Sequence, residues 1–471
     1  MKNKTLCIFI GIMIGIIIAT AAFGLFCKSR NGANIGGMPS GDMRQPPEMP
    51  NGNGNGAPPD KPDGNGGGPM GAQNIEYNAI TTLSSDTNLT DETYTSSNKD
   101  ENAVLAENKA NVTMESVTVE KTGDSDGGDA TSFYGNNSAV LAKDGATLTI
   151  NNATIKTDAT GANGVFSYGG SATTNNSSSD GTTVVISNST ITTSKDNSGG
   201  IMTTGGGTTK ATNLNIATAG TSSAAIRTDR GGGTVTVDGG TYKTTGQGSP
   251  TIYSTADISV SNAKLTSTAS EGIVIEGKNS VTIDSCELVD SNTKLNGKST
   301  TYKNIFLYQS MSEDAATGTS EFTAKNSNIT TNNGDTFYVT NTSAIINLEN
   351  NVIQNNDTNG NFLRVQKDSW GNSGANGGNV VLNLINQQVN GNIVVDEIST
   401  LEISMKSGSS FEGAINSDNI SENKIALTLD PSSKIKLTGD SYVTSLVDEV
   451  SDYSNIDFNG YKLYVNGVAI N

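Results

Sequence analysis

The hydrophobic pattern of this chain repeats from about residue 100 almost to its C-terminus. Residues 199–288 show the repeated unit most clearly, as GGIMTTGGGTTKATNLNIAT, AAIRTDRGGGTVTVDGGTYKTT, TIYSTADISVSNAKLTSTA and EGIVIEGKNSVTIDSCEL. Each version has a short apolar strand, a tight turn, a strand of alternating polar and apolar residues, an Asn/Asp/Gly corner and a final apolar residue. Two-residue alternation indicates β-strands, and a repeated unit of this length indicates a solenoid.

The repeats align on the apolar residue that closes each unit. The closing residues are Val119, Ile155, Ile191, Ile216, Tyr242, Leu265, Leu288, Ile329, Ile353, Val389 and Phe411. Most are separated by 22 to 26 residues, and four longer intervals indicate insertions after residues 119, 155, 288 and 353. The insertions add about 10 to 18 residues to a unit and so belong to loops outside the repeated strands.

A unit of this length fits one coil of a parallel β-helix, in which each coil hydrogen-bonds to the next about 4.8 Å away. The Thr, Val and Ile content argues against a helical solenoid, and the calcium-binding nonapeptide repeat is absent. One corner of the unit carries an amide or carboxylate at Asn188, Asn213, Asp238, Asn262, Asp284, Asn326 and Asn350. These residue types tolerate the left-handed conformation, so we expect them at a bend between two strands.

The N-terminal 73 residues have a different character. Residues 1–30 carry Lys2 and Lys4, then an uncharged run from Thr5 to Cys27, and then Lys28 and Arg30. The run is long enough to cross a bilayer of about 30 Å, which favours an uncleaved signal anchor, but Ala19-Thr20-Ala21 also has the form of a signal-peptidase site. Residues 31–73 are rich in Pro, Gly and Asn without apolar periodicity, which predicts a disordered spacer.

The coil resembles the right-handed parallel β-helix, or pectin-lyase-like, fold. The anchor, the Pro/Gly spacer and the Thr/Asn-rich coils together resemble adhesin-like surface proteins of Gram-positive bacteria. The resemblance implies an all-β solenoid of about 12–14 coils, preceded by an N-terminal apolar helix and the linker. We expect a signal peptide or signal anchor at 1–30, the spacer at 31–73, the β-helix at 74–420 and final coils with a C-terminal β cap at 421–471, where NG turns indicate hairpins.

Charge and composition exclude several functions. The net charge of −18 argues against a nucleic-acid partner, because phosphate binding requires clustered Lys and Arg. The sequence contains no His, which excludes Ser/His/Asp and Cys/His nucleophiles and His-ligated metals. The anchor predicts a location on the extracellular face of the membrane, in the cell wall or secreted, with membrane contact through the N-terminal segment only.

Alternation also predicts which residues point out of the coil. If Val140, Val165, Ile201, Ile226, Ile252 and Ile273 point inward, the next residue of each strand points outward. The resulting outward strip has two columns. The first is Leu105, Leu141, Phe166, Met202, Arg227, Tyr253, Val274, Phe306, Tyr338 and Arg364, and the second is Glu107, Lys143, Tyr168, Thr204, Asp229, Thr255, Glu276, Tyr308, Thr340 and Gln366.

The outward strip gathers aromatic residues in a chain that is only 5% aromatic. Exposed aromatic residues usually mark contact sites, and flanking charges suit sugar hydroxyls or a uronate carboxylate. The candidate ligand-binding residues are Phe166, Tyr168, Met202, Arg227, Asp229, Tyr253, Glu276, Phe306, Tyr308 and Tyr338. The alternative is that the insertions cover this face and the aromatic side chains pack beneath them.

The sequence leaves the function open between three classes. The first is a non-catalytic adhesin or carbohydrate-binding protein that contacts a glycan or another cell-surface polymer. The second is a polysaccharide lyase or glycoside hydrolase, for which Arg227, Asp229 and Glu276 are the catalytic candidates, with Glu271 and Glu276 as another carboxylate pair. The third is a passive component of the cell wall or a stalk.

We expect no cofactor, with one reservation about calcium. Asp124, Asp126 and Asp129 lie within six residues beside two glycines, and carboxylate oxygens are the ligands that Ca²⁺ prefers. The segment lacks the spacing of an EF-hand loop, so a solvated acidic turn is the other interpretation.

Overall fold

The computed structural model of the protein describes residues 75–171, 178–297, 299–310, 312, 314–420, 422 and 424–471. All of these residues belong to one compact unit. The predicted leader at 1–30 and spacer at 31–73 lie outside the described residues. A search of the described residues for a helix long and apolar enough to cross a membrane finds none.

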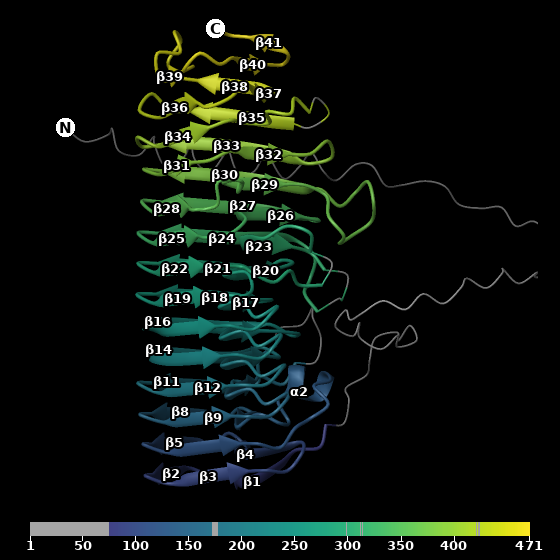
Figure 1. Cartoon of the computed structure of the whole chain (residues 1–471). Helices are drawn as coiled ribbons and strands as arrows, with labels where there is room; N and C mark the ends of the chain where they lie inside the picture. The colour runs from purple at the N-terminus through teal and green to yellow at the C-terminus, as the bar shows by residue number, and fades with distance from the viewer. Residues whose placement is uncertain are drawn as a thin grey trace, which may run out of the picture. The chain divides into compact units, whose positions relative to one another are not determined.

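The described residues form a parallel β-solenoid, as the hydrophobic pattern predicts (Figure 1). Its coils follow one another in sequence order, and each contributes strands to three faces. The closing residues from Val119 to Ile353 pair in register from one coil to the next, and Val389 pairs with Phe411. The predicted alignment is therefore confirmed at the level of individual strand pairs.

The strands divide among the faces as follows. The first face is a 12-stranded parallel sheet of β1 (Asn78–Leu83), β4 (Glu101–Ala106), β7 (Val140–Ala142), β10 (Val165–Tyr168), β13 (Ile201–Thr204), β15 (Ile226–Thr228), β17 (Ile252–Ser254), β20 (Ile273–Glu276), β23 (Lys303–Tyr308), β26 (Asp335–Thr340), β29 (Leu363–Val365) and β32 (Ile393–Val395). The second face contains β2 (Thr87–Thr90), β5 (Asn111–Glu115), β8 (Thr147–Asn151), β11 (Thr183–Ser187), β18 (Asp257–Ser261), β21 (Ser280–Asp284), β24 (Thr319–Lys325), β27 (Thr342–Glu349), β30 (Gly378–Ile385), β33 (Thr400–Lys406), β35 (Lys424–Leu429) and β38 (Ser445–Asp448).

The third face continues from the second around a corner. Its strands are β3 (Thr93–Ser96), β6 (Thr118–Lys121), β9 (Thr154–Thr157), β12 (Thr190–Thr193), β19 (Lys264–Ser267), β22 (Glu287–Asp290), β25 (Asn328–Thr331) and β28 (Val352–Asn355), followed by β31 (Gln388–Asn390), β34 (Ser410–Gly413), β36 (Lys434–Leu437) and β39 (Ile456–Asp457). Two long strands, β14 (Gly207–Thr218) and β16 (Gly233–Thr244), turn the corner without a break and pair on both faces. They join the second face and the third-face strands as far as β28 into one 22-stranded sheet, and β31, β34, β36 and β39 form a separate four-stranded sheet.

The corner between the second and third faces is built from left-handed residues. Asn188, Asn213, Asn262, Asn326 and Asn350 have φ between 48° and 56°, as predicted. In two coils the left-handed residue lies one position after the predicted one. Gly239 and Ser285 take that conformation there, instead of Asp238 and Asp284.

Side chains at this corner bond to each other along the solenoid. The Asn213 amide donates to Asn188 Oδ1 at 2.9 Å, and the Asn350 amide donates to Asn326 Oδ1 at 2.9 Å. Asp238 and Asp284 accept in the same way from Asn262 and Asn326. The Asn/Asp preference at the corner therefore serves both the bend and the contact between coils.

The core runs through the interior of the coils and is almost entirely aliphatic. Phe322, Phe337 and Phe362 form its aromatic section, with ring centroids 5.7 and 5.4 Å apart between neighbours. They come from β24, β26 and the residue before β29, so they connect the first and second faces. Because each coil buries its apolar residues against its own strands and against the coils above and below, stability is distributed along the solenoid.

The C-terminal end closes with a small sheet of β37 (Ser441–Val443), β40 (Leu463–Val465) and β41 (Val468–Ala469). Strands β40 and β41 are antiparallel, and Asn466 and Gly467 connect them with positive φ of 48° and 77°. Two left-handed residues suit the hairpin turn that an Asn-Gly pair favours. This small sheet lies in the 421–471 region, and regular coils continue into that region through β35, β36, β38 and β39.

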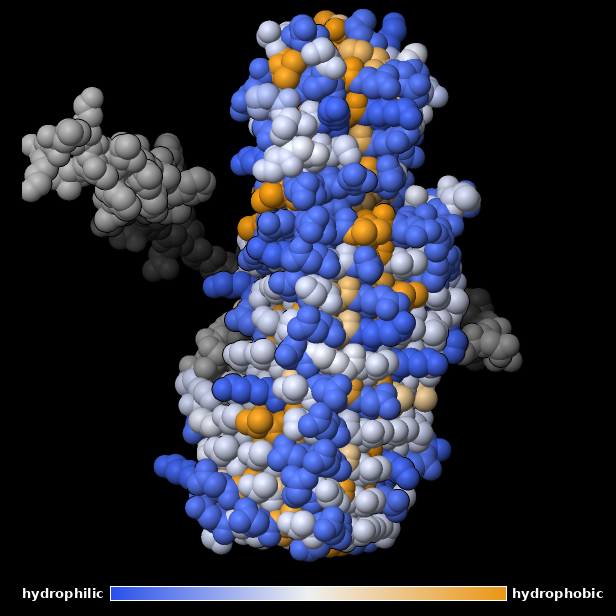
Figure 2. Space-filling view, turned by 90° about the vertical axis from the view of Figure 1, so that its left-hand side faces the viewer, coloured by the Kyte–Doolittle hydropathy of each residue, from blue (hydrophilic) through white to orange (hydrophobic). Residues whose placement is uncertain are grey.

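The outer surface seen on the side of the Asn corner is largely hydrophilic, with apolar atoms in narrow, broken lines (Figure 2). Among the described residues, the large apolar side chains that are exposed are Ile80, Val352, Ile385, Val447, Tyr461 and Val468. They are scattered over different strands and connections. The corner side of the solenoid therefore offers no broad apolar contact surface in this view.

Candidate functional site

The outward strip has the predicted register but is not open along its length. Pairing places Leu105, Leu141, Phe166, Met202 and Arg227 in successive coils, and continues through Tyr253, Val274, Phe306, Tyr338 and Arg364. Phe166 and Tyr338 nevertheless have no exposed surface, and Met202 is 1% exposed. The expectation that these three residues contact a ligand from an open face is corrected by their burial, because the insertions cover them.

The first cover is the insertion after residue 119. It contains α2 (Asp129–Tyr134), which ends at Gly135 in the left-handed conformation. A Cβ at Gly135 would lie 2.6 Å from the Phe166 ring, so the glycine allows the chain to pass directly over that ring. Tyr134 contacts Tyr168 edge to face with centroids 5.3 Å apart. The N-terminal part of the strip, from Leu105 to Met202, is thus a second, external hydrophobic cluster.

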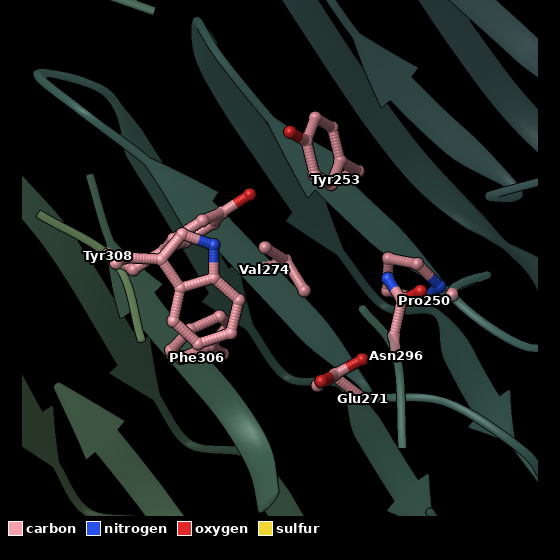
Figure 3. Close-up of a pocket in the computed structure, with 9 residues that line it drawn as sticks. Pro250, Tyr253, Glu271, Val274, Asn296, Phe306 and Tyr308 are labelled. Atoms are coloured by element: carbon pink, nitrogen blue, oxygen red, sulfur yellow. The ribbon is translucent and has the colours of Figure 1, made fainter. Parts of the chain in front are cut away.

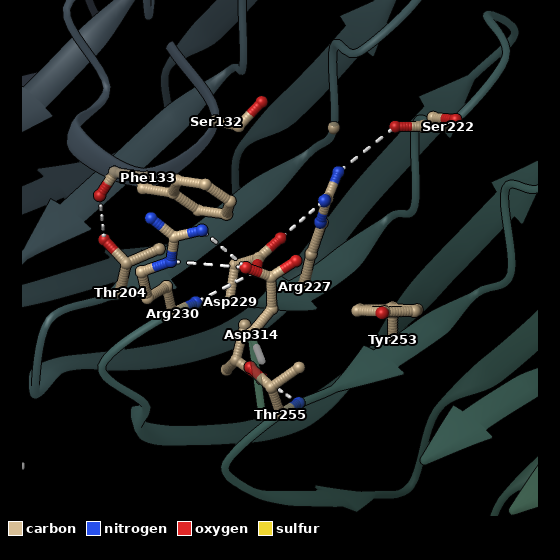
Figure 4. A network of polar contacts seen from close by, with 12 residues as sticks. Ser132, Phe133, Thr204, Ser222, Arg227, Asp229, Arg230, Tyr253, Thr255 and Asp314 are labelled. Carbon is tan, nitrogen blue, oxygen red and sulfur yellow. Dashed lines mark hydrogen bonds and ion pairs between the residues drawn. The ribbon is translucent and has the colours of Figure 1, made fainter. Parts of the chain in front are cut away.

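A polar network continues the cover in the middle of the strip (Figure 4). Arg227 pairs with Asp229 on its own coil, with 2.5 Å between nitrogen and oxygen. Arg230 binds Asp314 at 2.7 Å and lies over the Phe133 ring, with its guanidinium carbon 4.0 Å from the centroid. Asp314 belongs to the loop before β24 and Phe133 to α2, so Arg230 connects both covering segments to the solenoid. Burial raises the pKa of Asp229.

Glu276 is enclosed by hydroxyl groups. Its carboxylate accepts hydrogen bonds from Tyr253, Tyr308 and Ser310, and the residue is 1% exposed. Burial raises the pKa of Glu276 and raises those of Tyr253 and Tyr308 well above the usual tyrosine value. The catalytic candidates Arg227, Asp229 and Glu276 are therefore engaged with partners inside the protein. Glu276 contacts a covering loop through Ser310, and none of the three lines the open cleft described below.

The raised pKa of Glu276 predicts a pH-dependent contribution to stability. A group whose pKa is higher in the folded state stabilises the fold fully below its unfolded value, 4.5 for this residue, and the contribution is lost as pH rises through the folded pKa. Glu276→Gln removes this titration. We expect the variant to gain stability relative to the wild-type protein as pH rises from about 4 to about 7, measured by urea unfolding. Parallel stability curves for the two proteins would contradict this assignment.

The calcium candidates do not converge. Asp124 accepts a hydrogen bond from the Thr160 amide, Asp126 accepts one from the Gly128 amide, and Asp129 faces Arg230 at 3.6 Å. A search of the described residues finds no group of three acidic, cysteine or histidine side chains arranged to hold a metal ion. The segment leads into α2.

One part of the strip remains open as a cleft centred on Val274 (Figure 3). Its walls include Tyr253, Phe306, Tyr308 and Trp370. The Phe306 and Tyr308 rings stack 4.5 Å apart, and Trp370 lies 5.4 Å from each of them. The cleft holds about 60 Å³, which suits one substituent of a larger ligand. Three of its four aromatic rings come from the predicted strip, and the fourth comes from the insertion after residue 353.

Polar groups line the other side of this cleft. Glu271, Pro250 and Asn296 lie opposite the stacked rings (Figure 3). Glu271 is 5% exposed, accepts a hydrogen bond from Ser270, and lies 3.9 Å from the Lys303 ammonium group. Burial lowers the pKa of Lys303. Asn296 and Trp370 were not predicted, because both lie in insertions where the repeated pattern assigns no direction to a side chain.

Comparisons with known proteins do not assign a family. A scan against protein-family models, a search of curated proteins and a search of solved structures each return no match.

Proposed function

We propose that this chain is an extracellular glycan-binding protein that acts without chemistry. The observation that carries the proposal is the cleft with aromatic walls from Tyr253, Tyr308 and Trp370 and with Glu271 and Asn296 opposite. Flat aromatic rings contact the apolar faces of sugars, while a carboxylate and an amide bind hydroxyl groups. The three wall residues are half-buried, so their rings are held in place before any ligand arrives.

The proposed setting is the cell surface, as in the adhesin-like proteins with a right-handed, pectin-lyase-like β-helix that the sequence resembles. The charged-apolar-charged pattern of residues 1–30 supports export and membrane attachment, and the Pro/Gly-rich residues 31–73 support display at a distance. The paired state of Arg227 with Asp229 and the enclosure of Glu276 support binding over catalysis. A glycan or a similar polymer of the cell surface is the proposed partner.

The proposal predicts that Trp370→Ala weakens glycan retention. The ring forms a wall of the cleft, and an aromatic contact of this kind is worth about 0.5–1.5 kcal/mol, so we expect up to about tenfold weaker binding. The measurement is retention of the full chain on an array of neutral and uronate-containing polysaccharides, with released reducing ends and unsaturated products assayed in parallel. Val352→Ala is the control, because it removes an exposed apolar side chain from the third face.

Two results would overturn the proposed function. One is retention that Trp370→Ala leaves as strong as in the control variant. The other is turnover of any retained polysaccharide, which would place the chain among the lyases or hydrolases.

A further inference from the structure

We propose that the C-terminal end of the first face carries a second binding site, a groove for neutral oligosaccharides whose centre is the Tyr442 ring. The site deepens the proposed function and rests on it for the class of ligand. No residue that lines this groove also lines the cleft at Trp370.

The groove begins where the insertions end. Arg364 on β29 pairs with Val394 on β32, the bridge from Ile393 to Ile415 adds the next coil, and β37 and β40 follow. The insertion after residue 353 ends before β30 and is the last insertion predicted from the repeat spacing. The outward side of these later coils is hollowed in two adjoining places that share Asn416 and Ile420, with volumes of about 210 and 260 Å³.

Two tyrosines provide a rigid aromatic surface in this groove. Tyr442 and Tyr464 occupy paired positions on β37 and β40, with ring centroids 4.6 Å apart and planes inclined by 4°. Both side chains are half-buried, and Tyr442 lines the larger hollow. Tyr464 packs against one face of the Tyr442 ring and holds it in position. The opposite face of that ring is the surface available to a sugar, and little side-chain entropy is lost when the sugar binds.

The polar lining favours a neutral ligand. Asp396, Glu397 and Asp418 line the smaller hollow, and Asn419 and Asn466 line the larger one. The carboxylates accept hydrogen bonds from sugar hydroxyls, and the amides both accept and donate them. A uronate carboxylate would instead meet groups of like charge.

Two cations near the groove are already paired. Arg364 also lines the smaller hollow, but it binds Asp335. Lys367 is likewise paired with Glu397. These ion pairs reduce the attraction that the groove could offer to an anionic sugar.

The cleft and the groove lie on the same face of one rigid solenoid. Five coil steps separate Phe306 from Tyr442, which is about 24 Å at ~4.8 Å per coil. An extended polymer can therefore contact both places at once, and the second contact is then made at a high effective concentration. We infer that the chain recognises a length of polymer along the solenoid axis and that a single sugar unit is bound weakly.

The test compares Tyr442→Ala, Tyr442→Phe and Trp370→Ala in the full chain. The probes are cellohexaose, xylohexaose and mannohexaose, with hexagalacturonate as the charged comparison of equal length, and affinities are measured by calorimetry. For the neutral probe that binds best, we expect Tyr442→Ala to weaken binding at least fivefold and Tyr442→Phe to stay within about twofold, since the ring carries the contact. Hexagalacturonate is expected to bind more weakly than that probe.

The outcomes separate the two sites. Loss of binding in Trp370→Ala together with wild-type affinity in Tyr442→Ala would overturn the groove and leave the proposed function standing. Loss in Tyr442→Ala alone would support the groove and overturn the cleft. Stronger binding of hexagalacturonate, or binding of none of the probes, would overturn the groove as a neutral-sugar site. If Tyr442→Ala unfolds the cap, Tyr442→Leu, which keeps the apolar volume without the flat ring, gives the same comparison.

Discussion

Replacing Arg227 with methionine is expected to destabilise the middle of the solenoid by about 3–5 kcal/mol. Arg227 is the charged partner of Asp229, whose side chain is 4% exposed. Without the guanidinium, the Asp229 carboxylate would be buried beside Asp314 with one fewer positive charge nearby. Burial already raises the pKa of Asp229, so the carboxyl would take up a proton more readily in the variant and the loss would shrink toward acidic pH.

Urea unfolding at neutral pH measures this loss, and hydrogen exchange of β15 to β20 shows whether it is local. Local opening is expected because each coil of a solenoid contacts mainly its neighbours. The control is the double variant Arg227→Met/Asp229→Leu, in which no charge is left unpaired and most of the stability should return. Equal destabilisation in the single and double variants would show that the ion pair is not the cause.

Replacing Phe337 with alanine is expected to cost about 3–5 kcal/mol through a cavity in the core. Phe337 has no exposed surface and lies between Phe322 and Phe362, at centroid distances of 5.7 and 5.4 Å. The surrounding coils are held by continuous ladders on both sides, so they cannot collapse into the space. Both aromatic neighbours would therefore lose packing partners.

Phe337→Leu is the matched control, because it keeps most of the apolar volume and is expected to lose less than half as much stability. Thermal and urea unfolding of both variants provide the measurement. Similar losses for alanine and leucine would indicate that the site tolerates a cavity and that the interior aromatic section does not determine local stability.

The sequence predicts the coils well because each coil repeats the same physical requirement. An apolar residue must close each coil inside the solenoid, so residues as different as Val119, Tyr242 and Phe411 recur in one register. The corner was predicted less precisely than the closing residues. Gly239 and Ser285 occupy the left-handed position, and Asp238 and Asp284 lie one residue before it, in register with Thr212 and Ser261 respectively.

The site was predicted only in part, because insertions have no period. Alternation places Phe166 and Tyr253 in one outward column, but it does not show that α2 covers Phe166 while the chain around Tyr253 stays open. The contact between Arg230 and Asp314 spans 84 residues, and Trp370 reaches the strip from a loop without repeated spacing. The stacked pair of Tyr442 and Tyr464 lies beyond the last insertion, in coils whose outward residues the strip prediction did not include.

The central claim is that the cleft walled by Trp370 binds glycan, and this single tryptophan of the chain reports on it directly. Trp370 lines the cleft, so its fluorescence serves as a local probe in the unmodified protein. The decisive measurement is a fluorescence titration of the full chain with the neutral hexaoses. We expect a saturable change in Trp370 emission whose midpoint matches the calorimetric affinity. Calorimetric binding with constant Trp370 emission at saturation would contradict the account.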